Sequence, residues 1–213
     1  PVLAILPGLA LALQDDTLAV AWTADVGPDY PVMARRYNQN GTALGSTNFR
    51  LDNGAPDHTV IQTSPVLVQD PEGGFLGMWH QTRNLNGEFV DSQHGQRWAA
   101  DGTARAGLVV GDDNMGGSGV SDLGGNAYAP SVATNGQGLI LAGWTASLDY
   151  ADGFSRVTAF RNGQRLGDDA VTVGSYTQGD YFYSPNTEVV LSGRTATAVW
   201  YEQNADLEYS IRA

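Results

Sequence analysis

The feature that most constrains this chain is a proline followed 14 or 15 residues later by a tryptophan, which occurs four times. The pairs are Pro7 and Trp22, Pro65 and Trp79, Pro130 and Trp144, and Pro185 and Trp200. The period of about 55 to 65 residues is typical of repeat architectures in which each unit is one small supersecondary element. The sequence therefore divides into repeats at about 7–58, 59–123, 124–178 and 179–213, with residues 1–6 left over.

Each repeat is predicted to contain four antiparallel strands. Each of these four tryptophans closes an apolar run that follows a turn, as in DPEGGFLGMW, so the segment from proline to tryptophan is predicted to be a hairpin. A third strand then ends at Asn40-Gly41, Asp101-Gly102 or Asn162-Gly163. These dipeptides favour tight hairpin turns because both residues tolerate positive φ. A fourth strand is expected around residues 48–51, 108–110 and 170–173.

Four strands per repeat, with a tryptophan ending the second, predict an all-β fold: a four-bladed β-propeller that forms one domain over residues 1–213. The fourth repeat ends in its third strand, LEYSIRA. We therefore expect the N-terminal strand Pro1–Leu6 to complete the fourth blade and close the ring, which would remove exposed sheet edges. Two alternatives are a piece of a longer array and, for the apolar run 1–13, a signal peptide without the usual charged n-region.

Composition excludes several functional classes. The chain has no cysteine, so it can form neither a disulfide nor a thiolate metal site or nucleophile. Its 23 acidic residues outnumber 11 basic ones, and the formal charge is −12. Nucleic acid is not an expected partner, because phosphate binding needs a basic surface. Membrane insertion is not expected either, because the apolar run 1–13 is too short to span a bilayer.

The connections after the second and fourth strands are long, and in a propeller they share one face, here called the loop face. They cover residues of about 23–32, 46–64, 80–92, 108–129, 145–156, 170–184 and 201–207. These segments hold 14 acidic residues, three arginines and seven of the nine tyrosines. Long loops on one face of a rigid scaffold commonly carry binding residues, so the loop face is the predicted ligand site.

Carboxylates and amides beside tyrosines suit a glycan, which stacks on aromatic rings and hydrogen-bonds through its hydroxyls. The predicted ligand-binding residues are Asp29, Tyr30, His80, Arg83, Asp149, Tyr150, Asp152, Tyr181, Tyr201 and Asp206. The four repeat tryptophans are instead expected to pack between blades, because their spacing follows the strands.

The glycine-rich segment 111–126 is the predicted Ca²⁺ site, since calcium takes carboxylate and carbonyl oxygens. Its predicted ligands are Asp112, Asp113, Asn114 and Asp122. The segment matches no established calcium-loop spacing, and the alternative is that these acidic residues only keep the loop face soluble.

The runs SPVLVQDPEGGFLGMW, RRYNQNGTALG and QRWAADGTARAG resemble the tandem β-propeller-type repeats of large bacterial secreted and surface proteins, including adhesins and hemolysin-type proteins. The resemblance covers most of the chain. It implies an extracellular bacterial protein with an adhesive or recognition role, and it brings no catalytic residues. The calcium-binding nonapeptide GGxGxDxUx is absent from this sequence.

These observations predict a secreted or cell-surface recognition module that binds a glycan or an extracellular protein through its loop face, with Ca²⁺ as the expected cofactor. A carboxylate-dependent hydrolase is the first alternative, because glycosidases need two carboxyl groups about 5 to 10 Å apart and the loop face is rich in them. A structural or assembly module without a small ligand is the second.

Overall fold

The computed structural model describes residues 5–14, 16–25, 30–51, 60–85, 88–105, 108–109, 126–148, 152–177, 187–203 and 209–213. All regular secondary structure in these ranges is β-strand, which confirms the all-β prediction. The same ranges contain no helix with the length and apolarity needed to cross a membrane.

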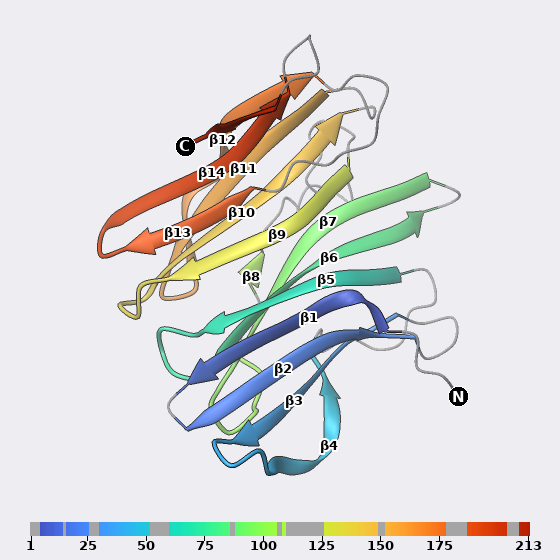
Figure 1. The fold of residues 1–213 in the computed structure, drawn as a ribbon, viewed down its shortest axis with the longest axis vertical. Helices are drawn as coiled ribbons and strands as arrows, with labels where there is room; N and C mark the ends of the chain where they lie inside the picture. The colour runs from blue at the N-terminus through green and yellow to red at the C-terminus, as the bar shows by residue number, and fades with distance from the viewer. Residues whose placement is uncertain are drawn as a thin grey trace.

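The strands form four antiparallel sheets that follow the four repeats (Figure 1). Sheet 1 consists of β1 (Ile5–Gln14), β2 (Thr17–Ala24), β3 (Val32–Asn38) and β4 (Ala43–Arg50). Sheet 2 consists of β5 (Val60–Gln69), β6 (Phe75–Leu85), β7 (Glu88–Trp98) and β8 (Leu108–Val109). Sheet 3 consists of β9 (Asn126–Thr134), β10 (Leu139–Leu148), β11 (Asp152–Arg161) and β12 (Gln164–Thr177). Sheet 4 consists of β13 (Glu188–Ser192), β14 (Thr195–Gln203) and β15 (Tyr209–Arg212).

Within each sheet the strands lie in chain order, as in a propeller blade. The first strands of successive sheets are neighbours: β1 contacts β5, β5 contacts β9 and β9 contacts β13. The predicted turns after the third strands are also present. Gly41, Gly102 and Gly163 all have positive φ, at 76°, 88° and 76°.

The core consists of the layers between adjacent sheets. Trp79 and Trp98 of sheet 2 pack against alanines of β1 and β2, and Trp144 of sheet 3 packs with Leu76 and Met78 of sheet 2. Trp200 of sheet 4 lies against Gly174 of β12, where a Cβ atom would collide with its indole ring. These contacts confirm the predicted packing role of three repeat tryptophans.

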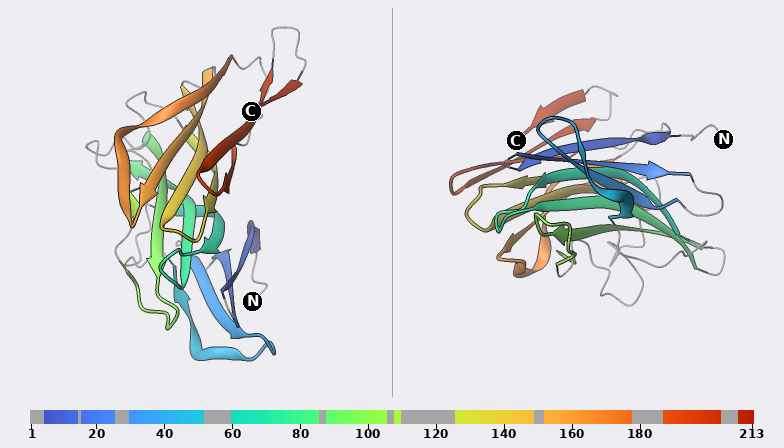
Figure 2. Two further views of the ribbon diagram at one scale, coloured as in Figure 1. Left: turned by 90° about the vertical axis from the view of Figure 1, so that its left-hand side faces the viewer. Right: turned by 90° about the horizontal axis from the view of Figure 1, so that it is seen from below.

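The N-terminal segment differs from its predicted role. Ile5 pairs with Ala24, so the described end of Pro1–Leu6 extends β1 in sheet 1 rather than completing sheet 4. Among the described residues, β15 pairs with β14 alone, and sheets 1 and 4 lie at opposite ends of the row of sheets (Figure 2). The physical reason is loop closure: pairing across the short β1–β2 turn loses less chain entropy than pairing across about 200 residues.

Two predicted loops are also wrong. Residues 80–85 and 88–92 belong to β6 and β7, which pair out to Leu85 and Glu88. Residues 145–148 and 152–156 belong to β10 and β11, which pair out to Leu148 and Asp152. Paired backbone hydrogen bonds therefore continue through these polar stretches, which the apolar pattern alone assigned to loops.

Candidate functional site

The structure describes only some of the predicted ligand-binding residues. Outside the described residues lie Asp29, Asp149, Tyr150, Tyr181 and Asp206, together with all four predicted calcium ligands, Asp112, Asp113, Asn114 and Asp122. Arg83, Asp152 and Tyr201 lie on strands β6, β11 and β14. Only Tyr30 and His80 have described side chains, and both are half-buried.

His80 sits in a strand rather than in a loop. It follows Trp79 on β6 and pairs with Thr63 of β5 and Gln93 of β7. Its Nδ1 lies 3.2 Å from the Thr63 hydroxyl oxygen. The ring is thereby fixed beside the first strand of sheet 2.

Tyr30 lies between sheets 1 and 2 at the loop face. It forms a parallel bridge with Ile61, and its carbonyl oxygen accepts a hydrogen bond from the Gln62 backbone amide at 3.2 Å. The same end of sheet 2 therefore holds both Tyr30 and His80, and the structure brings these two predicted residues into one region.

Polar side chains continue along the loop-face half of the sheets. We call this set the loop-face belt; its members are Gln62, Thr63, His80, Ser131, Thr145, Thr187 and Glu188. Gln62 joins sheets 1 and 2, because its Oε1 accepts from the Val32 backbone amide at 3.1 Å. Sheets 3 and 4 are joined by the hydroxyl groups of Thr145 and Thr187, 3.2 Å apart. The belt gives the loop connections a rigid polar base.

Glu188 is a candidate site residue that the sequence analysis missed. It is the first residue of β13, and its carboxylate is exposed. The Ser131 hydroxyl donates to Glu188 Oε2 at 2.7 Å while accepting from the Val189 amide at 3.1 Å. A carboxylate is thus held in one orientation on the first strand of sheet 4. Two features of the sequence could have indicated this pair. Ser131 directly follows the repeat proline Pro130, and Glu188 is an acidic residue at the start of a first strand.

A buried polar group lies behind His80. Gln93 is completely buried, and neither its amide nitrogen nor its amide oxygen has a hydrogen-bond partner among the described residues. Buried amides are normally paired, so Gln93 is an exception among the described residues of sheet 2.

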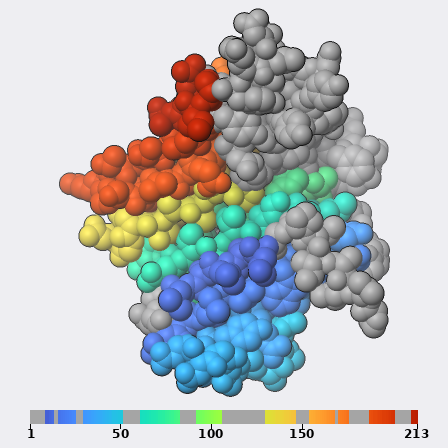
Figure 3. All heavy atoms as spheres, in the orientation of Figure 1, coloured from blue at the N-terminus to red at the C-terminus, as the bar shows by residue number. Residues whose placement is uncertain are grey.

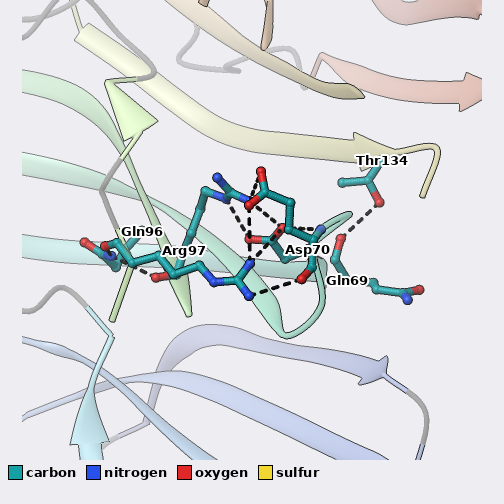
Figure 4. A network of polar contacts seen from close by, with 7 residues as sticks. Gln69, Asp70, Gln96, Arg97 and Thr134 are labelled. Carbon is teal, nitrogen blue, oxygen red and sulfur yellow. Dashed lines mark hydrogen bonds and ion pairs between the residues drawn. The ribbon is translucent and has the colours of Figure 1, made fainter. Parts of the chain in front are cut away.

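The opposite end of sheet 2 carries a separate charged cluster (Figure 4). Arg97 donates from Nε and Nη2 to the two carboxylate oxygens of Asp70, each at 2.7 Å, and Nη2 also lies 2.9 Å from Glu72. The hydrogen bond with Asp70 is the main cause that raises the pKa of Arg97. Thr134 of β9 donates to the Gln69 carbonyl at 3.1 Å and ties sheet 3 to the same turn.

This cluster was not predicted, because DPEGG indicated only a turn. Asp70 is fully buried and lies far along the strand from the loop face. The cluster therefore stabilises the turn end and is not part of the candidate site.

The described residues include no group of three or more His, Cys, Asp or Glu side chains that could hold a metal ion. The predicted calcium segment lies outside the described residues, so the Ca²⁺ prediction stays a prediction.

Comparison with known proteins gives a fold relationship. No family model matches the chain, and no curated protein matches it. Among solved structures, it is similar to a GH62 hydrolase in complex with xylotriose, at 13% identity and a TM-score of 0.53, covering 99% of this chain and 65% of that one. It is also similar to a mutant GH32 β-fructofuranosidase from Bombyx mori in complex with sucrose, at 13% identity and a TM-score of 0.52. This match covers 97% of this chain and 46% of that one.

This chain spans less than two thirds of the length of either structure. The likeness establishes an all-β, propeller-type fold. It supports the propeller-type part of the sequence resemblance and does not extend to adhesin or hemolysin-type repeats.

Proposed function

We propose that this protein acts on a glycan at its loop face, and that the activity is hydrolysis of a glycosidic bond. The observation that carries the proposal is an exposed carboxylate, Glu188, held by Ser131 on a first strand of a propeller-type fold. The fold is shared with a hydrolase solved with xylotriose and a β-fructofuranosidase solved with sucrose. These relationships favour hydrolysis over recognition alone.

Glycoside hydrolysis needs two carboxyl groups about 5 to 10 Å apart, one acting as general acid and the other as base or nucleophile. Glu188 supplies one candidate. The acidic connections supply the others, and Asp29, Asp149, Asp152 and Asp206 are the residues we assign to this role.

Sugar binding also needs aromatic and hydrogen-bonding groups beside the carboxylates. Tyr30 and His80 lie at the same end of sheet 2, and the Thr63 hydroxyl beside His80 is a further polar group there. We assign Arg83, Tyr150, Tyr181 and Tyr201 to the same glycan surface.

The test measures release of reducing sugar from a panel of xylan-, arabinan-, mannan- and fructan-type substrates. We expect the wild type to cleave at least one of them, and Glu188→Gln to reduce its rate at least about tenfold, because the amide cannot serve as an acid or nucleophile. Asp16→Asn, a carboxylate change at the β1–β2 turn on the opposite end, is the matched control and should keep full activity.

Failure can take two forms. Binding of an oligosaccharide without cleavage would support a recognition module, the second candidate function, and would remove the hydrolase proposal. Neither binding nor cleavage across the panel would overturn both.

Calcium assistance is a separate proposal, assigned to Asp112, Asp113, Asn114 and Asp122. Extracellular calcium modules work at weak affinities, which fits the proposed location of this protein outside the cell, secreted or at the cell surface. Glycan binding should weaken in chelator, and Asp112→Ala combined with Asp113→Ala should abolish that dependence. Equal binding with and without chelator would remove the calcium role.

A further inference from the structure

Sheet 1 carries an exposed apolar face, here called the Trp22 face. It consists of Leu9, Leu11, Leu13, Val20 and Trp22, which share one side of the β1–β2 hairpin because Leu9 pairs with Trp22 and Leu11 with Val20. The three leucines are 66%, 57% and 64% exposed, whereas the alternating Ala10 and Ala12 are buried against sheet 2. The atoms of β1 and β2 lie on the visible surface in Figure 3.

The equivalent faces of the other three sheets indicate which surface the Trp22 face would contact. Trp79, Trp144 and Trp200 occupy the positions equivalent to Trp22, and each packs against the sheet that precedes its own. The contacted side of that preceding sheet is here called its reverse face. Trp79 meets the alanines of sheet 1, Trp144 meets Leu76 and Met78 of sheet 2, and Trp200 meets Gly174 of sheet 3. Among the described residues, no sheet precedes sheet 1.

At the other end of the row, described residues on the complementary side of sheet 4 are exposed. Val189 of β13 is buried against Gly143 of sheet 3, so its neighbour Val190 points to the reverse face of sheet 4. Val190 is 56% exposed, and Ile211 of β15, also on the reverse face, is 80% exposed. The molecule therefore presents both halves of its own internal interface.

We propose that the occupant of the Trp22 face is the reverse face of sheet 4 from a second copy of this chain, in a head-to-tail contact. Within one molecule the same kind of interface joins sheet 1 to sheet 2, sheet 2 to sheet 3, and sheet 3 to sheet 4. The proposed contact repeats it between two molecules. Apolar patches of this kind on a soluble protein mark association surfaces. Because the two contacting surfaces differ, the association is heterologous and builds rings or open chains.

A basic residue borders the Trp22 face. Arg35 lies on the Trp22 side of sheet 1, since it pairs with Val20, and its guanidinium stacks over Tyr37 at 5.8 Å. Two copies each carry a formal charge of −12, so net charge opposes this association and the contact depends on its apolar residues.

The experiment is sedimentation velocity of the purified 213-residue chain over a series of concentrations. We expect reversible growth beyond the monomer, and Leu11→Glu should raise the dissociation constant at least about tenfold by placing a charge in the apolar contact. Val190→Glu, on the other surface, should have the same effect. Leu166→Glu on β12, a side chain of 45% exposure away from both surfaces, is the control and should leave association unchanged.

Mixing the two variants tests the head-to-tail geometry. Leu11→Glu keeps an intact reverse face and Val190→Glu keeps an intact Trp22 face, so the mixture should form dimers that grow no further. Association that is insensitive to Val190→Glu would indicate a symmetric contact between two Trp22 faces and would overturn the proposal. A wild-type chain that stays monomeric at every concentration would overturn it as well. Leu13→Glu serves as a second variant if Leu11→Glu alters the circular dichroism spectrum.

Discussion

Asp70 is the buried charge on which the turn between β5 and β6 depends. Its carboxylate is fully buried, and it accepts two hydrogen bonds from Arg97 and one from the Glu72 backbone amide at 2.8 Å. Burying a carboxylate costs several kcal/mol unless a partner compensates. Arg97, which is itself almost fully buried, is the hydrogen-bonded partner, and Arg105 Nη1 lies farther away, 3.7 Å from Asp70 Oδ1.

Arg97→Met should therefore lower the free energy of unfolding by about 3 kcal/mol, because it leaves the Asp70 carboxylate buried without its guanidinium. Urea unfolding followed by tryptophan fluorescence measures the loss. Combining it with Asp70→Asn should recover more than half of it. Arg161→Met, which removes an exposed arginine from β11, is the control and should change stability by less than about 0.5 kcal/mol.

Asp101 gives a pH-dependent prediction at the turn after β7. Its carboxylate accepts a hydrogen bond from the Thr103 backbone amide at 2.8 Å, and hydrogen bonding from Thr103 lowers the pKa of Asp101. A carboxyl group whose pKa is lower in the folded state stabilises that state above its unfolded pKa, and the contribution disappears as the pH falls through the folded pKa.

Asp101→Asn should therefore be less stable than the wild type at about pH 7, and the gap should be smaller at about pH 2.5, below the usual pKa of an aspartate. The Asn-Gly turn that results already occurs in the first and third repeats, so the backbone tolerates it. Urea midpoints at the two pH values measure the difference. A gap that is the same at both values would show that ionisation of Asp101 does not contribute.

At the scale of elements, the contact between sheets 3 and 4 depends on a residue without a side chain. Gly174 of β12 leaves room for the Trp200 indole of β14, whereas a Cβ atom would overlap its ring atoms. Overpacking of a formed interface displaces neighbouring side chains and backbone.

Gly174→Ala should lower the free energy of unfolding by about 1 to 3 kcal/mol, and Trp200 fluorescence should shift toward the emission of an exposed indole. Thr172→Ala, an exposed change two residues earlier on the same strand, is the matched control. Equal stability of the two variants would show that sheet 4 moves to accept the methyl group at no cost.

The sequence predicted the strands and their hairpin pairing more accurately than it predicted where each strand ends. The four Pro-to-Trp segments predicted hairpins, and the β1–β2, β5–β6, β9–β10 and β13–β14 pairs confirm them. Strand ends were less accurate. His80 and Asp152 were placed in loops but lie in paired strands, because backbone hydrogen bonds continue where the apolar pattern stops.

At the scale of the whole molecule, the charge is unevenly distributed. The formal charge is −12, and the seven predicted loop-face segments carry −11 of it. The sequence predicts that these segments share one end of the molecule, where their like charges would repel one another, and salt screens such repulsion.

The melting temperature should therefore rise as NaCl is raised from about 10 to about 200 mM at neutral pH, as the screening length falls below the spacing of the loops. Near the sequence pI of about 4.3 the same salt series should have a smaller effect, since fewer acidic residues are ionised and the basic residues balance them. A melting temperature that does not change with salt at neutral pH would show that the acidic loops are already compensated.

The sequence by itself determined what depends on short-range chemistry. Alternating apolar residues, the repeat tryptophans and the Asn-Gly and Asp-Gly turns specify strands and hairpins whose partners lie within about 20 residues. The number of repeats, the all-β class and the burial of Trp79 and Trp144 follow from that pattern.

The tertiary structure alone decided which distant residues meet. Asp70 and Arg97 are 27 residues apart, and Ser131 and Glu188 are 57 apart, so no local pattern relates them. Strand pairing within sheet 2 brings Asp70 to Arg97, and the stacking of sheet 4 on sheet 3 brings Glu188 to Ser131. Stacking also covers Trp79, Trp144 and Trp200, whereas no described sheet precedes the sheet that carries Trp22. Equivalent repeat positions therefore have different neighbours at the end of the row.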